Sequence, residues 1–252
     1  LKGLSAADAN QRAAILADVN ASGFLRVTAP DPTATAALKP FKDKVEVFNK
    51  TIVATVGEEL CSRRVPGGVG SIDYSRSSTS CNAQGSVNLR GGDIQQIAAE
   101  AYLQIGHSKY GGADISLQSG GGARIPLTPG NVTAANVIQV LPFGNMLFRL
   151  EVTGQEVKDM LEDGMQAVYG PGGSTGPYPY TGGLRFDVDA TRAEGSRVSQ
   201  IEVRDAATGV WGPLALPRTY KLFVLSFNAT GGDGYKTLAA VPTARRLDIG
   251  VL

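Results

Sequence analysis

The chain has 252 residues, 42% of them hydrophobic, and its 24 basic and 23 acidic residues leave a formal net charge of +1. This length can bury a core in one large domain or two small ones, and so balanced a charge argues against binding to nucleic acid or to an acidic membrane surface. No apolar run approaches the roughly 18 residues of a membrane-spanning helix, so the composition predicts a soluble globular protein.

The first fifty residues are predicted to form two helices. Leu1–Phe24 has apolar residues at helical spacing and lacks the basic and apolar regions of a signal peptide. That absence is uninformative in a mature fragment, which is how we interpret the chain. Asp31 and Pro32 are typical of the cap and first position of a second helix, which we expect to extend to about Asn49. One face of that helix is expected to carry Leu38, Phe41, Val45 and Phe48.

The two cysteines, Cys61 and Cys81, bracket a segment rich in Arg, Gly and Ser. A disulfide between them would restrain that segment and indicates an oxidising compartment, whereas two buried free thiols would fit a cytosolic protein. Of these alternatives we favour the disulfide. The one histidine, His107, lies in a loop-like stretch and is expected to face solvent, and no Cys-x-x-Cys pair predicts a zinc site.

Strands and helices follow one another irregularly from residue 51 onward. We expect a long loop at Cys61–Asn88, then a helix that Asp93 and Gln96 begin by capping each other reciprocally. A short helix is expected at Thr133–Val140. Strands are expected at Thr51–Val56, Ala113–Gln118, Met146–Val152, Leu184–Val188, Arg197–Val203 and Thr219–Leu225.

A capping box at Thr153 and Glu156 predicts a further helix after the strand at 146–152. Its inward-facing residues are expected to be Val157, Met160, Leu161, Met165 and Val168. Tyr169–Gly183, rich in Gly, Pro and Tyr, is predicted to be a loop with Tyr178 and Tyr180 at a pocket rim or exposed. Because the elements lack regular βαβ order, the pattern predicts an α+β fold of mixed sheets layered with helices.

Three glycine-rich stretches adjoin apolar segments, namely SGGGAR at Ser119–Arg124, LPFGN at Leu141–Asn145 and SFNATGGDGY at Ser226–Tyr235. Glycine lets a ligand approach the main chain closely. The stretches also supply two phenyl rings that can enclose a planar base, a carboxylate that can accept from vicinal hydroxyls, and a guanidinium that can bind phosphate. Base, sugar and phosphate together indicate a nucleotide.

Each of these side chains also has an ordinary explanation. Phe143 and Phe227 could be core residues, Asp233 could form an Asx turn, and Arg124 could be a solvated surface arginine.

Gly172–Gly176 matches the G-x-S-x-G pattern of a nucleophile elbow, but no apolar strand precedes it and no helical spacing follows. We therefore treat that match as chance.

From about Pro30 to its end the chain resembles the C-terminal, substrate-binding domain of the 5'-nucleotidase family, especially its bacterial periplasmic 5'-nucleotidase/UDP-sugar hydrolase branch. The similar blocks, in order, are ADISLQSGGGAR (Ala113–Arg124), the spacing through NVTAANVIQVLPFGN, VTGQE (Val152–Glu156) and SFNATGGDGY. The resemblance implies a 5'-nucleotidase C-terminal domain-like fold at 51–252. A connector at 1–50 would include a hinge helix between domains.

The resemblance also implies roles for seven residues. Two phenylalanines would stack on the base, one aspartate would hold the ribose hydroxyls, two arginines would contact phosphate, and two residues of the glycine turn would approach the base edge. In that order they are Phe143, Phe227, Asp233, Arg124, Arg90, Ser119 and Gly121. The turn after Arg90, Gly91–Gln95, departs from the Glu-Ser/Thr-Asn-x-Gly pattern usual in the family.

Enzymes of this family hydrolyse phosphate esters with two divalent metal ions held in an N-terminal metallophosphoesterase domain. One histidine cannot furnish that site, so we expect the catalytic domain to be absent from this chain, which alone would be inactive and hold no metal or other cofactor. The expected partners are that domain and a nucleotide or UDP-sugar, in a periplasmic or secreted bacterial protein.

Other functions remain open at this point. The chain could be a free-standing nucleotide-binding module, or part of a sister-branch phosphoesterase acting on a cyclic nucleotide, NAD or a thiosulfate carrier. The phenylalanine pair favours a ligand that contains a base. A structural or adhesive role fits least well, because a scaffold has no need of two aromatic residues, an arginine and an aspartate on glycine-rich turns.

Overall fold

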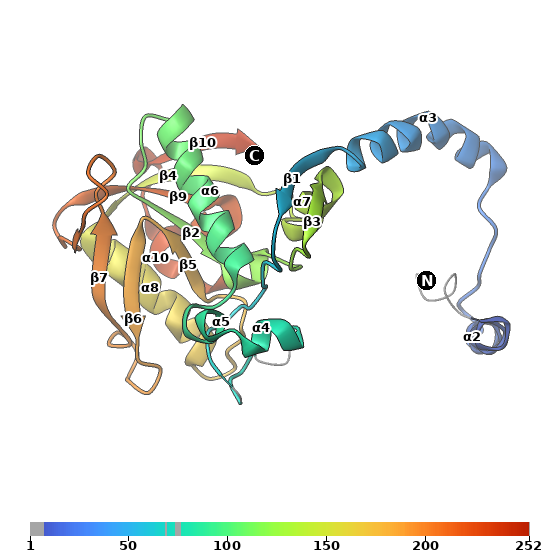
Figure 1. The fold of residues 1–252 in the computed structure, drawn as a ribbon, viewed down its shortest axis with the longest axis horizontal. Coiled ribbons are helices and arrows are strands. Elements are labelled where there is room, and N and C mark those ends of the chain that lie inside the picture. Colours follow the sequence, from blue (N-terminus) through green and yellow to red (C-terminus); the bar gives the residue numbers. More distant parts are fainter. Residues whose placement is uncertain (1–7, 69, 74–76, 252) are drawn as a thin grey trace. The chain divides into compact units, whose positions relative to one another are not determined.

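The computed structural model describes residues 8–68, 70–73 and 77–251. The chain divides into two units, Leu1–Asn49 and Lys50–Leu252. Figure 1 shows the elements of each unit, and each is described here by itself.

The first unit consists of α2 (Ala9–Ala21) and α3 (Pro32–Asn49), and residues 1–7 of the predicted first helix lie outside the described residues. The Ala34 amide donates to the Asp31 carboxylate at 2.8 Å, which confirms the predicted start of α3. Neither helix has a buried residue. The apolar residues expected on one face of α3 are all exposed: Leu38, Phe41, Val45 and Phe48.

A five-stranded sheet organises the second unit. Its strand order is β10 (Arg246–Val251), β4 (Met146–Thr153), β9 (Thr219–Leu225), β2 (Ile115–Ser119) and β5 (Pro179–Gly182). The β9–β2 pair is parallel, and the other pairs are antiparallel. The carboxyl ends of β2 and β9 consequently lie side by side.

Helices cover both faces of this sheet, α6 (Asp93–Lys109) on one and α8 (Gly154–Tyr169) with α10 (Lys236–Ala240) on the other (Figure 1). Alternate residues of β9 serve the two faces: Leu222 and Val224 join the core with α8, and Phe223 packs with α6. A strand buried on both faces reads as a continuous apolar run. The predicted inward residues of α8 are all buried: Val157, Met160, Leu161, Met165 and Val168.

Two smaller sheets complete the unit. One has the order β6 (Leu184–Val188), β7 (Val198–Arg204) and β8 (Trp211–Pro213), and the other pairs β1 (Ile52–Val56) with β3 (Gly130–Thr133). The short helix α7 (Ala134–Val140) begins with a capping box at Thr133, close to its predicted position. Mixed sheets with helices packed on them confirm the α+β prediction.

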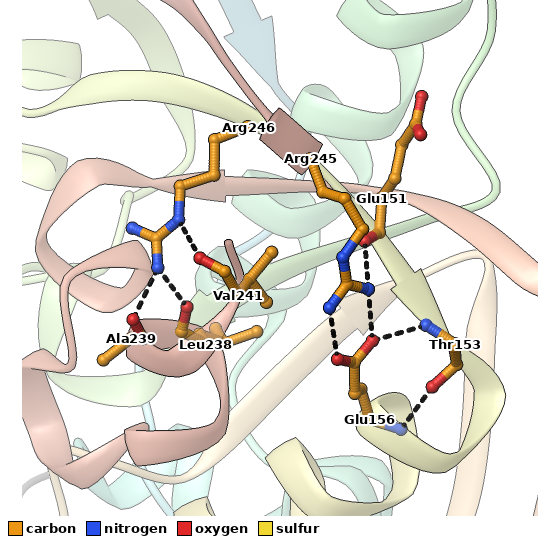
Figure 2. Close-up of polar contacts among 8 residues, drawn as sticks. All are labelled: Glu151, Thr153, Glu156, Leu238, Ala239, Val241, Arg245 and Arg246. Atoms are coloured by element: carbon orange, nitrogen blue, oxygen red, sulfur yellow. Dashed lines mark hydrogen bonds and ion pairs between the residues drawn. The ribbon is translucent and has the colours of Figure 1, made fainter. Parts of the chain in front are cut away.

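The start of α8 is tied to the C-terminal segment. Thr153 and Glu156 form the predicted capping box. Arg245, at the end of the 3₁₀ helix η4 (Thr243–Arg245), donates to the two Glu156 oxygens at 2.8 and 2.7 Å (Figure 2). These bonds lower the pKa of Glu156 from its ordinary 4.5 to about 2. The neighbouring Arg246 donates to three carbonyls around the end of α10, those of Leu238, Ala239 and Val241.

The prediction of a single long loop at Cys61–Asn88 is wrong. That segment contains α4 (Thr79–Ala83), and α5 (Gly85–Arg90) begins within it. Helices this short cannot show a helical period in sequence, so tertiary contacts must stabilise them. The Cys61–Cys81 disulfide is present and confirms the favoured alternative.

A buried arginine holds this segment in place. Arg63 is fully buried, and its guanidinium donates to the Ser77 hydroxyl at 2.9 Å and to the Asn82 side chain, among other partners. Its carbonyl oxygen accepts from the Gly92 amide at 3.1 Å and from the Tyr180 hydroxyl at 2.5 Å. These polar contacts add to the apolar cluster of Cys61, Cys81 and Val87 and dock the segment on the start of α6.

The helix α6 begins near the predicted residue but without the predicted reciprocal cap, because Gly92 is its N-cap. The Asp93 carboxylate instead accepts from the Cys61 amide at 2.9 Å, and Gln96 donates to the Thr181 carbonyl at 2.7 Å. Both side chains are used in tertiary contacts. His107 is exposed, as predicted, but it lies in the last turn of α6 rather than in a loop.

The predicted loop at Tyr169–Gly183 is also only partly a loop, since it supplies the edge strand β5. Tyr178 and Tyr180 are buried rather than exposed, with 8% and 2% of their surface accessible. The rings lie 5.4 Å apart in an edge-on arrangement.

No helix in the described part of the chain is both long enough and apolar enough to span a bilayer.

Candidate functional site

A cavity of about 350 Å³ lies at the end of the central sheet where β2 and β9 terminate. The turns after Ser119 and Leu225 leave the sheet at this edge because the two strands are parallel. Leu147 of β4 is opposite Leu225, and Pro179 of β5 is opposite Ser119, so the loops before these antiparallel strands reach the same edge. Segments far apart in the sequence therefore converge here, and the volume is within the usual range for ligand pockets.

The structure brings together six of the seven residues singled out from the sequence. These six line the cavity: Ser119, Gly121, Arg124, Phe143, Phe227 and Asp233. The seventh, Arg90, lines a different cavity.

The turn after β2 depends on glycine. Within the 3₁₀ helix η2 (Gly120–Gly122), the Gly121 amide donates to the Gly176 carbonyl at 2.8 Å, and a Cβ on Gly121 would lie 2.9 Å from the Gly176 Cα. A Cβ on Gly120 would lie 2.7 Å from the Arg64 carbonyl oxygen. These approaches are closer than a side chain allows, so the turn packs directly on two other backbone segments.

Asp233 is held in an uncommon backbone conformation. It has φ 58° and ψ 20° within the 3₁₀ helix η3 (Gly232–Gly234), a region that Asp tolerates better than most residues. Its half-buried carboxylate lies near the Ser119 side chain and the positive charge of Arg64, both of which favour the ionised form. Burial outweighs both effects and raises the pKa of Asp233 above its ordinary 3.8. A ligand hydroxyl that donated to this carboxylate would offset its desolvation.

The two phenyl rings are not core residues, since Phe143 is 54% and Phe227 48% exposed. The Phe227 ring packs against Gly232, where a Cβ would lie 2.5 Å from it. The Arg124 guanidinium carbon lies 5.6 Å from the centre of the Phe143 ring, within cation–π range, and its Nη1 donates to the Gly121 carbonyl at 3.1 Å. The arginine and both rings therefore line one cavity.

Ser226 joins the two segments that carry the rings. It is the first residue of α9 (Ser226–Ala229), and its hydroxyl accepts from the Met146 amide at 3.1 Å. The same hydroxyl donates to Asn145 Oδ1 at 3.5 Å. These bonds fix α9, with Phe227, against the loop that carries Phe143.

Sequence reasoning did not identify four polar residues that also line the cavity, namely Arg64, Asn145, Ser174 and Asn228. Ser174 belongs to the Gly172–Gly176 stretch, whose match to a nucleophile elbow was treated as chance. Asn145 and Asn228 stand within the glycine-rich stretches, close to Phe143 and Phe227, so their positions were the signal that could have found them. Arg64 lies in the segment predicted to be a loop, and the arginine pair after Cys61 was the only signal for it.

The second cavity, of about 590 Å³, lies beside β5, β6 and α6 and contains Arg90 and Trp211. The guanidinium carbons of Arg185 and Arg204 lie 4.5 and 5.8 Å from the Trp211 ring centre. Each of these two arginines is also paired with a glutamate at 2.7 Å. The charges of Arg185 and Arg204 are therefore already compensated.

Metal-binding chemistry is not apparent in the described residues. Within them, no three His, Cys, Asp or Glu side chains are grouped so that they could hold a metal ion. These residues therefore do not fit a two-metal hydrolytic centre.

Part of the chain is similar in sequence to known nucleotidases. A probable 5'-nucleotidase of Treponema pallidum is 38% identical over 166 residues, which are 65% of this chain and 27% of that protein. The NAD 5'-nucleotidase of Haemophilus influenzae is 37% identical over 142 residues, 56% of this chain and 23% of that protein. The chain thus spans about a quarter of the length of these relatives.

A solved structure of the Haemophilus influenzae NAD nucleotidase has a TM-score of 0.66 and 26% sequence identity to this chain. The match covers 96% of this chain and 40% of that protein. The family model for the C-terminal domain of 5'-nucleotidase matches residues 68–240. That match covers more than half of the chain, which therefore belongs to the 5'-nucleotidase C-terminal domain family.

Proposed function

We propose that this chain is the substrate-recognition domain of a 5'-nucleotidase or UDP-sugar hydrolase, and that it binds the base, ribose and phosphate of a nucleotide. One observation carries the proposal: two half-exposed phenyl rings, a half-buried carboxylate and an arginine line a single cavity. Each group suits a different part of a nucleotide, and a surface shaped by packing alone has no reason to gather them.

The base stacks between Phe143 and Phe227, and the exposed ring faces support this role because stacking on an aromatic side chain is worth about 1–3 kcal/mol per base. Asp233 accepts from the ribose hydroxyls. Ser119 and Gly121, which line the cavity, approach the edge of the base.

Arg124 binds phosphate, and Arg64 on the neighbouring segment lines the same cavity and adds a second guanidinium. A guanidinium keeps its charge at any physiological pH and presents several donors to phosphate oxygens. Arg90 is left out of this assignment because it lines the other cavity.

Hydrolysis belongs to a separate N-terminal metallophosphoesterase domain that carries two divalent metal ions. We propose that residues 1–50 are the connector to that domain, with α3 as a hinge helix, and that residues 51–252 are the nucleotide-binding domain. The whole protein would act in the bacterial periplasm or outside the cell, where the Cys61–Cys81 disulfide is stable.

NAD is a second candidate substrate. The Haemophilus influenzae relative named for NAD is similar to this chain both in sequence and in its solved structure. NAD contains an adenosine monophosphate unit, so it would use the same cavity. A free-standing nucleotide-binding module with no catalytic domain is the further alternative.

Calorimetric titration of the chain with AMP, UMP, UDP-glucose and NAD tests the proposal. We expect binding by the wild type that Phe143→Ala and Phe227→Ala each weaken strongly. Phe41→Ala, which removes an exposed phenylalanine of α3, is the matched control and should bind as the wild type does. Phosphatase activity, assayed in parallel with manganese, should be absent, and turnover by this chain alone would contradict the proposed division of labour.

A further inference from the structure

Within the described part of the chain, the side-chain amide of Asn228 is buried without a hydrogen-bond partner. It is 1% exposed, and neither its Oδ1 nor its Nδ2 has a partner among the described residues. Buried polar side chains are nearly always paired, because an unmade hydrogen bond leaves the cost of desolvation without compensation. A native exception requires a physical reason.

The position of Asn228 supplies that reason. It lines the cavity and directly follows Phe227 in α9. Its own carbonyl accepts from the Gly231 amide at 3.0 Å, and the next carbonyl, of Ala229, accepts from Arg246 at 3.2 Å. These backbone acceptors beside the side chain are therefore satisfied, whereas its amide group lacks partners among the described residues.

We propose that the Asn228 amide binds the edge of the base enclosed by Phe143 and Phe227 and so contributes to base selectivity, an inference that rests on the proposed function. A carboxamide offers one acceptor atom and one donor atom side by side. That pair matches a base edge with one donor and one acceptor, such as the amino group and ring nitrogen of adenine or the N3–H and carbonyl of uracil. Phosphate offers acceptors alone and would satisfy half of the amide.

Both polar atoms of Asn228 are shielded from solvent in the structure. A rotation about the side-chain torsions therefore accompanies binding and turns the amide to the ligand. This rotation distinguishes a role in recognition from a purely structural role, in which the amide would keep its environment when a nucleotide binds.

Variants of Asn228 test the inference with pairs of ligands. Purine riboside 5'-monophosphate lacks the amino group of AMP, and 3-methyluridine 5'-monophosphate lacks the N3–H of UMP. The comparison uses the pair whose natural nucleotide, AMP or UMP, binds the wild type more tightly. We expect the wild type to prefer that nucleotide over its analogue by about tenfold or more. Asn228→Leu, which is similar in size, should bind the nucleotide and its analogue equally. Asn228→Asp keeps the acceptor that faces the amino group or the N3–H but loses the donor, so it should keep the preference while binding both members more weakly. A preference retained in Asn228→Leu, or lost in Asn228→Asp, would overturn the inference.

Nuclear magnetic resonance on the wild type gives an answer that does not depend on how the variants fold. The side-chain amide resonances of Asn228 should shift on addition of AMP but not of ribose 5-phosphate. Those of Asn10, exposed on α2, are the control and should not move. Binding of AMP that leaves the Asn228 resonances unchanged would overturn this inference alone. Failure of every nucleotide to bind would instead overturn the proposed function, and this inference with it.

Discussion

Adding one methyl group at Gly232 tests whether Phe227 and Phe143 stack on the base. A Cβ there would lie 2.5 to 2.6 Å from three atoms of the Phe227 ring, closer than real Cβ atoms approach their neighbours. Gly232 does not have a positive φ, so its backbone accepts alanine. In Gly232→Ala the ring must therefore move, while every charged group of the cavity remains.

The expected loss can be estimated from the geometry. Displacing one of two stacking rings removes about 1–3 kcal/mol of interaction with the base, which weakens binding by about 5- to 150-fold. Phe227 is 48% exposed and can swing toward solvent, so the free energy of unfolding should fall by less than about 1 kcal/mol. Calorimetric titration with AMP and thermal unfolding measure the two effects separately.

Gly144→Ala is the matched control. Gly144 follows Phe143 in the opposite loop and has no positive φ, and a Cβ added to it would have no atom within 4 Å. This variant should bind AMP as the wild type does. If Gly232→Ala also kept the wild-type affinity, Phe227 could not be a stacking residue. A large loss of stability would show that the ring is not free to move.

Three further results are expected. Because the folded-state pKa of Glu156 is lowered to about 2, its ion pair with Arg245 stabilises the fold above about pH 4.5 and is lost as the pH falls toward 2. Glu156→Gln should therefore lower the free energy of unfolding by about 1–2 kcal/mol at pH 7 and by much less near pH 2.5, measured by urea denaturation, and a difference independent of pH would contradict this. Reduction of the Cys61–Cys81 disulfide, which closes a loop with a sequence separation of 20, should lower the unfolding free energy by about 3 kcal/mol, measured with and without a thiol reductant. Asp233→Asn should weaken AMP about tenfold but leave 2',3'-dideoxy-AMP unaffected in the same titration, and an equal loss for both would argue against a ribose contact.

Most of the candidate site could be predicted because its residues lie in motifs. Phe143, Phe227 and Asp233 stand on glycine-rich turns directly beside apolar strands, and the sequence shows both features. Whether those turns meet depends on strand order, which sequence does not state. The parallel pairing of β2 with β9 is what brings the turns to one edge.

The parts that could not be predicted are stabilised by tertiary contacts. The helices α4 and α5 are too short to show periodicity and depend on the buried Arg63 and the disulfide. The strand β5 looks like a loop because it contains proline and glycine, but its proline occupies the first position of an edge strand, where a missing amide is tolerated. The expectation for Arg90 rests on a motif that this chain does not keep, and the structure places that residue in the other cavity.

The central claim is that the cavity at the ends of β2 and β9 holds a nucleotide by its base, ribose and phosphate. A crystal structure of the chain with AMP tests it most directly. The account predicts the adenine between Phe143 and Phe227, with the ribose hydroxyls on Asp233 and the phosphate near Arg124. AMP bound elsewhere, for example beside Trp211 in the second cavity, would contradict it.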